Sequence, residues 1–167
     1  SWQIETAVNS NIYSDISMPL TVSNADNGKR IRYTATNGCG TTNSNAVFIT
    51  VNPLPNAAGT IIGSATVCQG QNTVAYSVPT ITNATGYNWT LPTGATIASG
   101  INTRSITVNF ANNASSGNIN VTGTNTCGNG TTSANFAVTV NPLPNATGTI
   151  IGAATVCQGQ SAVSYTV

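Results

Sequence analysis

The stretch VNPLPNAAGTIIGSATVCQGQNTVAYSV at residues 51–78 returns as VNPLPNATGTIIGAATVCQGQSAVSYTV at residues 140–167. The two stretches differ at six of their twenty-eight positions and begin eighty-nine residues apart. Repetition at a constant period is the signature of tandem units, and about ninety residues is the size of one small β-sandwich domain. The sequence therefore predicts a tandem array of small domains.

Between the two copies, apolar and polar residues alternate with a period of two, which is the pattern of β-strands. The alternation covers residues 74–78, 87–91, 106–110, 119–121 and 136–140, and two shorter strands are expected near 60–62 and 65–67. About seven short strands without helical periodicity are typical of a two-sheet sandwich. We predict an all-β chain of tandem immunoglobulin-like, seven-stranded β-sandwich modules.

The alternation also predicts which side chains form the core. Trp89 lies where a sandwich keeps its core tryptophan, and Trp2 and Trp89 precede Cys39 and Cys127 by nearly equal spacings, which indicates equivalent strands. Sugar stacking by Trp89 or Tyr87 is the alternative, but inward positions on alternating strands favour core packing. The predicted core comprises Trp89, Tyr76, Tyr87, Val108, Val121, Phe136 and Val138.

A looser repeat marks where each module ends, as TNGCGTTNSNAVFITV before Asn52 and TNTCGNGTTSANFAVTV before Asn141. Because part of a module cannot close a core, we expect the chain to be a section of a longer array. The prolines of each linker fix φ and remove a hydrogen-bond donor, so both linkers should be short and stiff. We divide the chain into the C-terminal part of an Ig-like module (1–51), a proline linker (52–58), a complete module (59–140), a second linker (141–147) and the N-terminal part of the next module (148–167).

Charged residues are scarce, which excludes several classes of function. The chain has four basic residues, three acidic residues and no histidine, and residues 27–167 contain no carboxylate side chain. Acid–base and nucleophilic catalysis need a titratable group beside the reacting atoms, and metal sites need clustered carboxylates, cysteines or histidines. We therefore predict no enzyme, no cofactor and no metal site.

The same scarcity argues against two kinds of partner. Nucleic-acid binding draws its affinity from many lysines and arginines, and the chain has only four in total. A membrane span needs about twenty consecutive apolar residues, and no stretch approaches that length. We expect neither nucleic-acid binding nor insertion into a membrane.

Four motifs carry a resemblance to a known family: IxGxxxVCxGQ, the central Trp89, TNxCG and the closing VTVNPLP. Residues 59–140 resemble the PKD-like repeat modules of large Bacteroidota cell-surface adhesins, and residues 2–51 resemble the Ig-like modules beside them. The resemblance implies an extracellular location on the bacterial cell surface, export by the type IX secretion system and a role in adhesion or gliding motility. It carries over no catalytic residue.

An extracellular location permits disulfides, and the candidates are Cys39, Cys68, Cys127 and Cys157. Two pairings remain open. Cys68 could bond Cys127 within one module, or each could bond a cysteine of a neighbouring module. A seven-residue strand spans about 23 Å, whereas a disulfide needs Cα atoms within about 7 Å, which favours the inter-module version.

The function that these features favour is a structural repeat, the stalk or spacer of an adhesin, whose partners are the neighbouring modules of the same chain. Other domains of the protein would then contact surface polysaccharide or an abiotic surface. One alternative is a polysaccharide-binding accessory module, and another is a subunit of a self-assembling surface filament. Exposed rings of Tyr13, Tyr76 and Trp89 would favour polysaccharide binding, whereas buried rings would favour the spacer.

Overall fold

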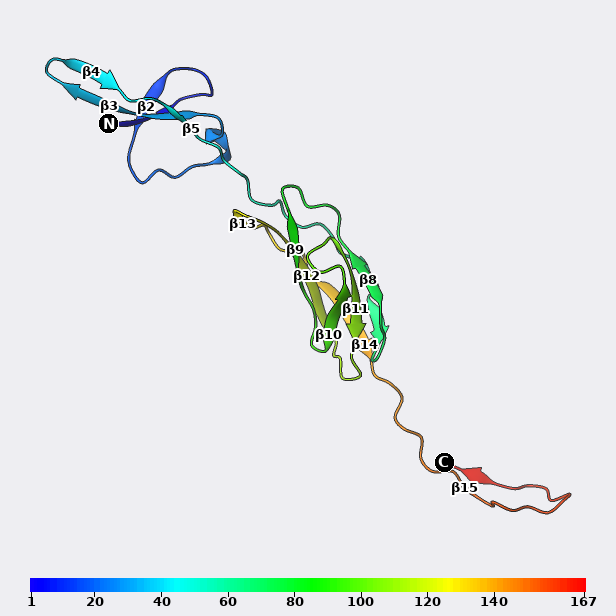
Figure 1. Ribbon diagram of the computed structural model, residues 1–167. Helices are drawn as coiled ribbons and strands as arrows, with labels where there is room; N and C mark the ends of the chain where they lie inside the picture. Colours follow the sequence, from blue (N-terminus) through cyan, green and yellow to red (C-terminus); the bar gives the residue numbers. More distant parts are fainter.

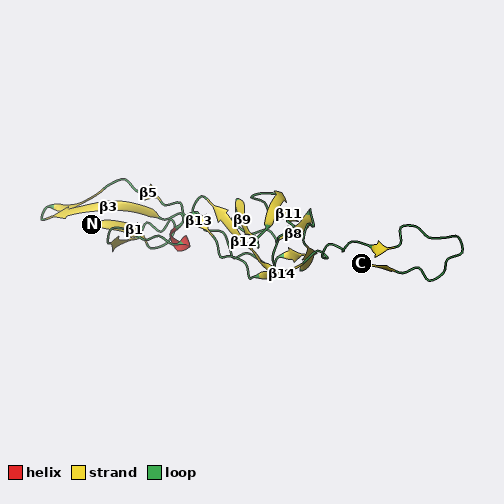
Figure 2. Cartoon of the chain, turned by 90° about the horizontal axis from the view of Figure 1, so that it is seen from below, coloured by secondary structure: helices red, strands yellow, loops and turns green.

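The chain forms three β-units that follow one another along a line, as Figures 1 and 2 show in perpendicular views. A computed structural model describes all 167 residues. The units are the N-terminal sheet (β1–β5), the central sandwich (β6–β14) and the C-terminal hairpin (β15–β16), and no strand of one unit pairs with a strand of another. The one helical segment is the 3-10 turn η1, Asn24–Asp26, and no helix of the chain is long and apolar enough to cross a membrane.

The N-terminal sheet has the strand order β2-β1-β3-β4, with β5 paired to β3. Its one fully buried charged side chain is Glu5. The backbone N–H groups of Asn11 and Arg30 each donate to this carboxylate over 3.0 Å. The Arg30 guanidinium also bonds it and is the largest cause of a pKa lowered to about 2. The strands are β1 Trp2–Glu5, β2 Tyr13–Ile16, β3 Arg30–Asn37, β4 Gly40–Asn43 and β5 Val47–Phe48.

The central sandwich consists of two sheets packed face to face. One has the order β10-β11-β8-β6, and the other the order β13-β12-β14-β7, with β9 paired to β12. All pairs are antiparallel except β7 with β14. The strands are β6 Ile62–Gly63, β7 Thr66–Cys68, β8 Val74–Ser77, β9 Gly86–Thr90, β10 Ala95–Ser99, β11 Ser105–Phe110, β12 Gly117–Asn125, β13 Gly128–Asn129 and β14 Phe136–Asn141.

The structure thus has nine hydrogen-bonded segments where the alternation pattern predicted about seven strands. The two short strands expected near 60–62 and 65–67 are β6 and β7, of which β6 pairs with β8 in one sheet and β7 with β14 in the other. The two additional segments are β10 and β13, and β13 is a two-residue strand between the turn at Cys127 and β14. The edge strand β10 was not predicted, because only Ala95 and Ile97 face the core from it, and both are half-buried.

The core lies between the two sheets and contains fourteen buried apolar residues. Five of the seven predicted core residues are among them: Tyr76, Trp89, Val108, Val121 and Val138. The other two, Tyr87 and Phe136, are half-buried and pack against this core. The Tyr87 hydroxyl accepts a hydrogen bond from the Ile81 N–H over 3.3 Å. Phe136 meets the ring of Tyr76 edge to face, with the centroids 6.0 Å apart.

Burial of Trp89 is possible because its polar atom has a partner. The indole Nε1–H donates to the carbonyl of Thr103 over 2.9 Å, and the ring is 8% exposed. A buried indole without such a partner would incur the cost of an unmade hydrogen bond. The ring therefore contributes its full apolar area to the core.

The C-terminal hairpin, β15 Ile151–Gly152 with β16 Tyr165–Thr166, reproduces the β6–β8 pair of the sandwich. Gly152 pairs with Tyr165 as Gly63 pairs with Tyr76. The Tyr165 hydroxyl donates to the Ala153 carbonyl over 3.0 Å, and that of Tyr76 donates to the Ser64 carbonyl over 2.9 Å. The sequence repeat is therefore also a repeat of local structure.

Candidate functional site: the linker joints

The first linker is held by the turn that joins β12 to β13. Asn125 ends β12, and its Oδ1 accepts hydrogen bonds from the N–H groups of Cys127 over 2.9 Å and Gly128 over 3.2 Å, which stabilise the turn. Its Nδ2 donates to the carbonyls of Pro53 over 2.8 Å and Asn83 over 3.0 Å. One side chain thus ties the turn to the linker. We call this contact between residues 125–131 and 53–58 the N-terminal joint.

Glycines let the linker lie close against this turn. A Cβ at Gly130 would lie 2.5 Å from the Pro55 carbonyl oxygen, and a Cβ at Gly128 would lie 3.2 Å from a methyl of Leu54. Gly128 also has a φ of +142°, which side chains disfavour. The TNxCG motif and the nearby Gly130 therefore form a turn whose surface accommodates a proline-rich segment.

A different turn holds the second linker. In Cys68-Gln69-Gly70-Gln71, the Gln71 side chain accepts a hydrogen bond from the Cys68 N–H over 2.9 Å, and Gly70 has a φ of +75°. The Gln69 N–H donates to the Asn141 carbonyl over 2.9 Å. The Gln69 side chain donates to the Ala114 carbonyl over 3.1 Å and accepts from the Leu143 N–H over 3.4 Å. We call this contact between residues 68–71 and 141–143 the C-terminal joint.

The turn of the C-terminal joint recurs in the C-terminal hairpin. The Gln160 side chain accepts from the Cys157 N–H over 3.0 Å, and Gly159 has a φ of +80°. The CxGQ motif thus specifies a local turn, with the glycine at positive φ and the second glutamine closing the turn.

The two joints lie at opposite ends of the central sandwich. Gly117 of β12 lies opposite Val138 of β14, and the two strands are antiparallel. From this pair, β12 runs eight residues in one direction to Asn125, and β14 runs three residues in the other direction to Asn141. At about 3.3 Å per residue, the joints are about 36 Å apart. Figure 1 shows β13 at one end of the sandwich and the second linker leaving β14 at the other.

None of the four candidate cysteines forms a disulfide in the structure; all are free and exposed. Cys68 belongs to the C-terminal joint and Cys127 to the N-terminal joint, so about 36 Å separates them along the sheet. A disulfide spans Cα atoms only up to about 7 Å apart. The pairing of Cys68 with Cys127 within one module is therefore incompatible with the fold.

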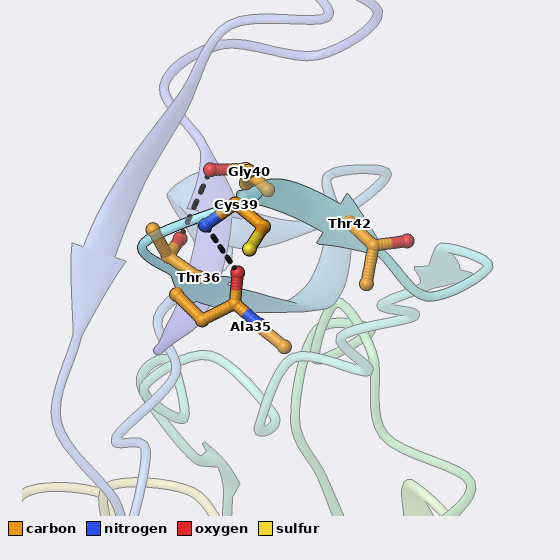
Figure 3. Close-up of a pocket in the computed structure, with 7 residues that line it drawn as sticks. Ala35, Thr36, Cys39, Gly40 and Thr42 are labelled. Atoms are coloured by element: carbon orange, nitrogen blue, oxygen red, sulfur yellow. Dashed lines mark hydrogen bonds between the residues drawn. The ribbon is translucent and has the colours of Figure 1, made fainter.

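The N-terminal sheet contains a second copy of the Cys127 turn. The Cys39 N–H donates to Asn37 Oδ1 over 2.9 Å, as the Cys127 N–H donates to Asn125 Oδ1. This hairpin of β3 and β4 borders a depression, which Figure 3 shows in close-up. Its lining residues are Ala35, Thr36, Asn37, Cys39, Gly40, Thr41 and Thr42. By the alignment of the two motifs, they correspond to the part of the central sandwich on which the first linker lies.

The aromatic residues do not form an exposed flat row. Tyr76 is 1% and Trp89 8% exposed, and the half-buried ring of Tyr13 is covered by the Arg32 guanidinium, 3.8 Å from its centroid. Trp2 and Tyr33 are exposed and meet edge to face with their centroids 5.4 Å apart. The two tryptophans occupy equivalent strand positions, as predicted, because Trp2 pairs with Tyr33 where Trp89 pairs with Val121.

Sequence reasoning did not identify Asn125 and Gln69 as linker-binding residues. The signal was present, since both lie inside repeated motifs, TNxCG and CxGQ. We interpreted these motifs through their cysteines, as disulfide candidates. The hydrogen bonds to the linkers are made instead by the neighbouring amide side chains.

Comparison with known proteins agrees with this architecture. A family model described as a PKD-like domain matches residues 54–138, half of the chain. The matched region begins at residue 54, inside the first linker, and ends in β14, so it contains strands of both sheets and the N-terminal joint except Pro53. A search of curated proteins finds no match.

Proposed function

This chain belongs to the PKD-like domain family, and from that membership we propose that it is a stalk segment of a large extracellular adhesin. PKD-like domains are typically non-catalytic structural modules and are commonly extracellular. The stalk would project a distal binding domain away from the bacterial cell surface. Its immediate partners would be neighbouring modules of the same chain.

The observation that carries this proposal is the placement of the two joints. Each end of the sandwich holds a linker of the same sequence, Asn-Pro-Leu-Pro-Asn, by a side-chain amide. Joints at opposite ends make successive modules follow one another lengthwise. Repeats that contact only their neighbours form a quasi-one-dimensional array whose length grows with the number of modules.

The chemistry of the surface suits a spacer. Residues 27–167 have no carboxylate, and the chain has only four basic residues. Changes of salt or pH act on a protein through charges that can be screened or titrated. A stalk with so few charges would keep its shape as the surroundings of the cell change.

The proposal also covers the role, the location and the export route. The adhesin would serve adhesion or gliding motility, lie on the cell surface of a member of the Bacteroidota and be exported by the type IX system. All three are supported by the motifs IxGxxxVCxGQ and TNxCG, which resemble those of such adhesins. Contacts with polysaccharide or abiotic surfaces would then be made by other domains. Burial of Tyr76 and Trp89 favours the spacer over a polysaccharide-binding module, because stacking on a sugar needs exposed rings.

Small-angle X-ray scattering of the purified chain tests the spacer function. We expect the profile of an elongated particle in which the N-terminal sheet and the central sandwich keep a constant separation from low to high salt. A particle in which these units fold back on each other would contradict the proposal.

Binding to an array of bacterial and algal polysaccharides tests the alternative. The spacer predicts no retention of the labelled chain on any glycan. Saturable binding that is lost when the exposed Trp2 is changed to alanine would favour the polysaccharide-binding function instead.

A further inference from the structure

We propose that Cys68 forms a disulfide with the cysteine at the Cys127 position of the module that follows it in the chain. The proposal rests on the tandem stalk described above and names the covalent bond that would lock one module to the next. The partner is a second copy of the Cys127 turn.

The first step is the position of Cys68 at the C-terminal joint. In the parallel pair of β7 and β14, Cys68 lies directly beside Asn141, the first residue of the second linker. The next residue, Gln69, bonds the carbonyl of Asn141 and the N–H of Leu143. Cys68 is therefore held against the start of the linker, and it is exposed.

The second step is the position of Cys127 at the N-terminal joint. Asn125 holds the carbonyl of Pro53 over 2.8 Å. On the other side of Cys127, a Cβ at Gly128 would lie 3.2 Å from the side chain of Leu54. Cys127 is therefore at the level of residues 53–54 of the first linker, and it too is exposed.

The repeat brings these two positions together. The linker residues Asn-Pro-Leu-Pro-Asn are identical at 52–56 and 141–145. A following module that binds its linker as the central sandwich does would place its cysteine at the level of Pro142 and Leu143. Cys68 is at the level of Asn141. One to two residues of extended chain span about 3–7 Å, which meets the Cα separation of about 4.4–6.8 Å that a disulfide requires.

The bond forms by oxidation of two thiols. Two cysteine S–H groups lose two protons and two electrons, and one S–S bond forms. A disulfide oxidant accepts the two electrons and two protons and is reduced to two thiols, and the disulfide oxidoreductases of the bacterial periplasm are oxidants of this class. Both thiols must be reachable by the oxidant, and Cys68 and Cys127, whose turn the partner repeats, are exposed.

An extended chain tests the proposal. Residues 79–140 are added again after Val167, which completes the third module with a copy of the second and brings the cysteines to five: the four present and the added copy of Cys127. After incubation with oxidised glutathione, reduced glutathione and glutaredoxin remove glutathione from unpaired cysteines, and unreacted thiols are counted under denaturing conditions. The inter-module bond predicts three free thiols, the intra-module bonds predict one, and no bond predicts five.

Two matched variants identify the cysteines involved. Cys68→Ser should abolish the bond and leave four free thiols, since four cysteines then remain. Cys157→Ser removes the equivalent cysteine of the third module, whose partner would lie in a further module, and should leave the bond intact with two free thiols. Persistence of the bond in Cys68→Ser, or five free thiols in the oxidised parent chain, would overturn the inference.

Scattering from the same extended chain separates this inference from the proposed function. Five free thiols with a constant spacing between modules would overturn the disulfide and leave the spacer standing. A variable spacing in both the oxidised and the reduced chain would count against the spacer itself.

Discussion

The Nδ2 of Asn125 donates a hydrogen bond over 2.8 Å to the carbonyl oxygen of Pro53, which lies seventy-two residues earlier in the chain. The same side chain closes the turn at Cys127. A single amide therefore couples the end of the sandwich to the linker that joins it to the N-terminal sheet.

Asn125→Ala should lower the free energy of unfolding of the central sandwich by about 1–3 kcal/mol, since hydrogen bonds contribute about 1 kcal/mol net and unpaired groups cost more. It should also increase the range of angles that the N-terminal sheet and the central sandwich adopt about the first linker. Denaturant unfolding followed by Trp89 fluorescence, in a Trp2→Phe background, measures the first effect, and small-angle scattering measures the second. The control is Asn118→Ala, an exposed asparagine of β12. Equal effects of the two changes would contradict the role given to Asn125.

Ile119→Ala should destabilise the sandwich by about 2–5 kcal/mol, the usual cost of deleting a buried isoleucine side chain to alanine. Ile119 is 0% exposed between the sheets, whereas Ile101 is 73% exposed. The same substitution at Ile101 should change stability by less than about 0.5 kcal/mol. Chemical denaturation of both variants checks the difference, and similar losses would mean that the core is misplaced.

Gly63→Ala should destabilise the sandwich by about 1–3 kcal/mol, because a Cβ there would lie 2.2 Å from the ring of Tyr76. The ring is buried and its hydroxyl is bonded to the Ser64 carbonyl, so it has little room to move. Gly38→Ala is the control, since its Cβ would meet nothing within 4 Å. The melting temperature reports both changes, and no loss in Gly63→Ala would show that the ring can shift freely.

The two structured halves should respond differently to acid. The pKa of Glu5 is lowered from 4.5 to about 2, chiefly by the hydrogen bond from Arg30. A carboxylate whose folded pKa lies below its unfolded pKa stabilises the fold above the unfolded value, and this stabilisation is lost as the pH falls through the folded value. The N-terminal sheet should therefore lose stability between about pH 4.5 and pH 2, while the central sandwich, which has no carboxylate, should not.

Single-tryptophan variants separate the two responses. Trp89→Phe leaves Trp2 to report on the N-terminal sheet, and Trp2→Phe leaves Trp89 to report on the sandwich. Both melting temperatures should stay nearly constant from pH 5 to pH 8. Glu5→Gln should weaken the acid response of the N-terminal sheet, and an acid transition of similar size in the sandwich would contradict the assignment.

Much of the fold could be predicted because its strands alternate strongly. Ile106, Val108 and Phe110 point into the core as their period of two requires. The two short strands at the start of the module were expected, but their division between the two sheets could not be predicted, because β6 and β7 are local neighbours whose partners β8 and β14 lie far apart in sequence. The edge strand β10 was not predicted, because an edge strand makes few apolar contacts and its alternation of apolar and polar residues is therefore weak.

The candidate joints were predictable only in part. The linkers and the repeated motifs could be read directly, and the prolines indicated stiff spacers. That Asn125 and Gln69 hold the linkers depends on contacts that span seventy-two and seventy-four residues. No local pattern encodes such contacts.

Tyr76 and Tyr165 occupy equivalent positions of the sequence repeat, and they separate what the local sequence determines from what the tertiary structure determines. Each tyrosine pairs with a glycine and donates a hydrogen bond to a nearby carbonyl. The repeated sequence by itself determined this local structure, because turn and strand register depend on neighbours within about a dozen residues. Only the tertiary structure decided their burial. Tyr76 is 1% and Tyr165 56% exposed, because an opposite sheet covers the first ring and none covers the second. Burial requires contacts from distant segments, and these follow from the packing of the two sheets and not from any local stretch.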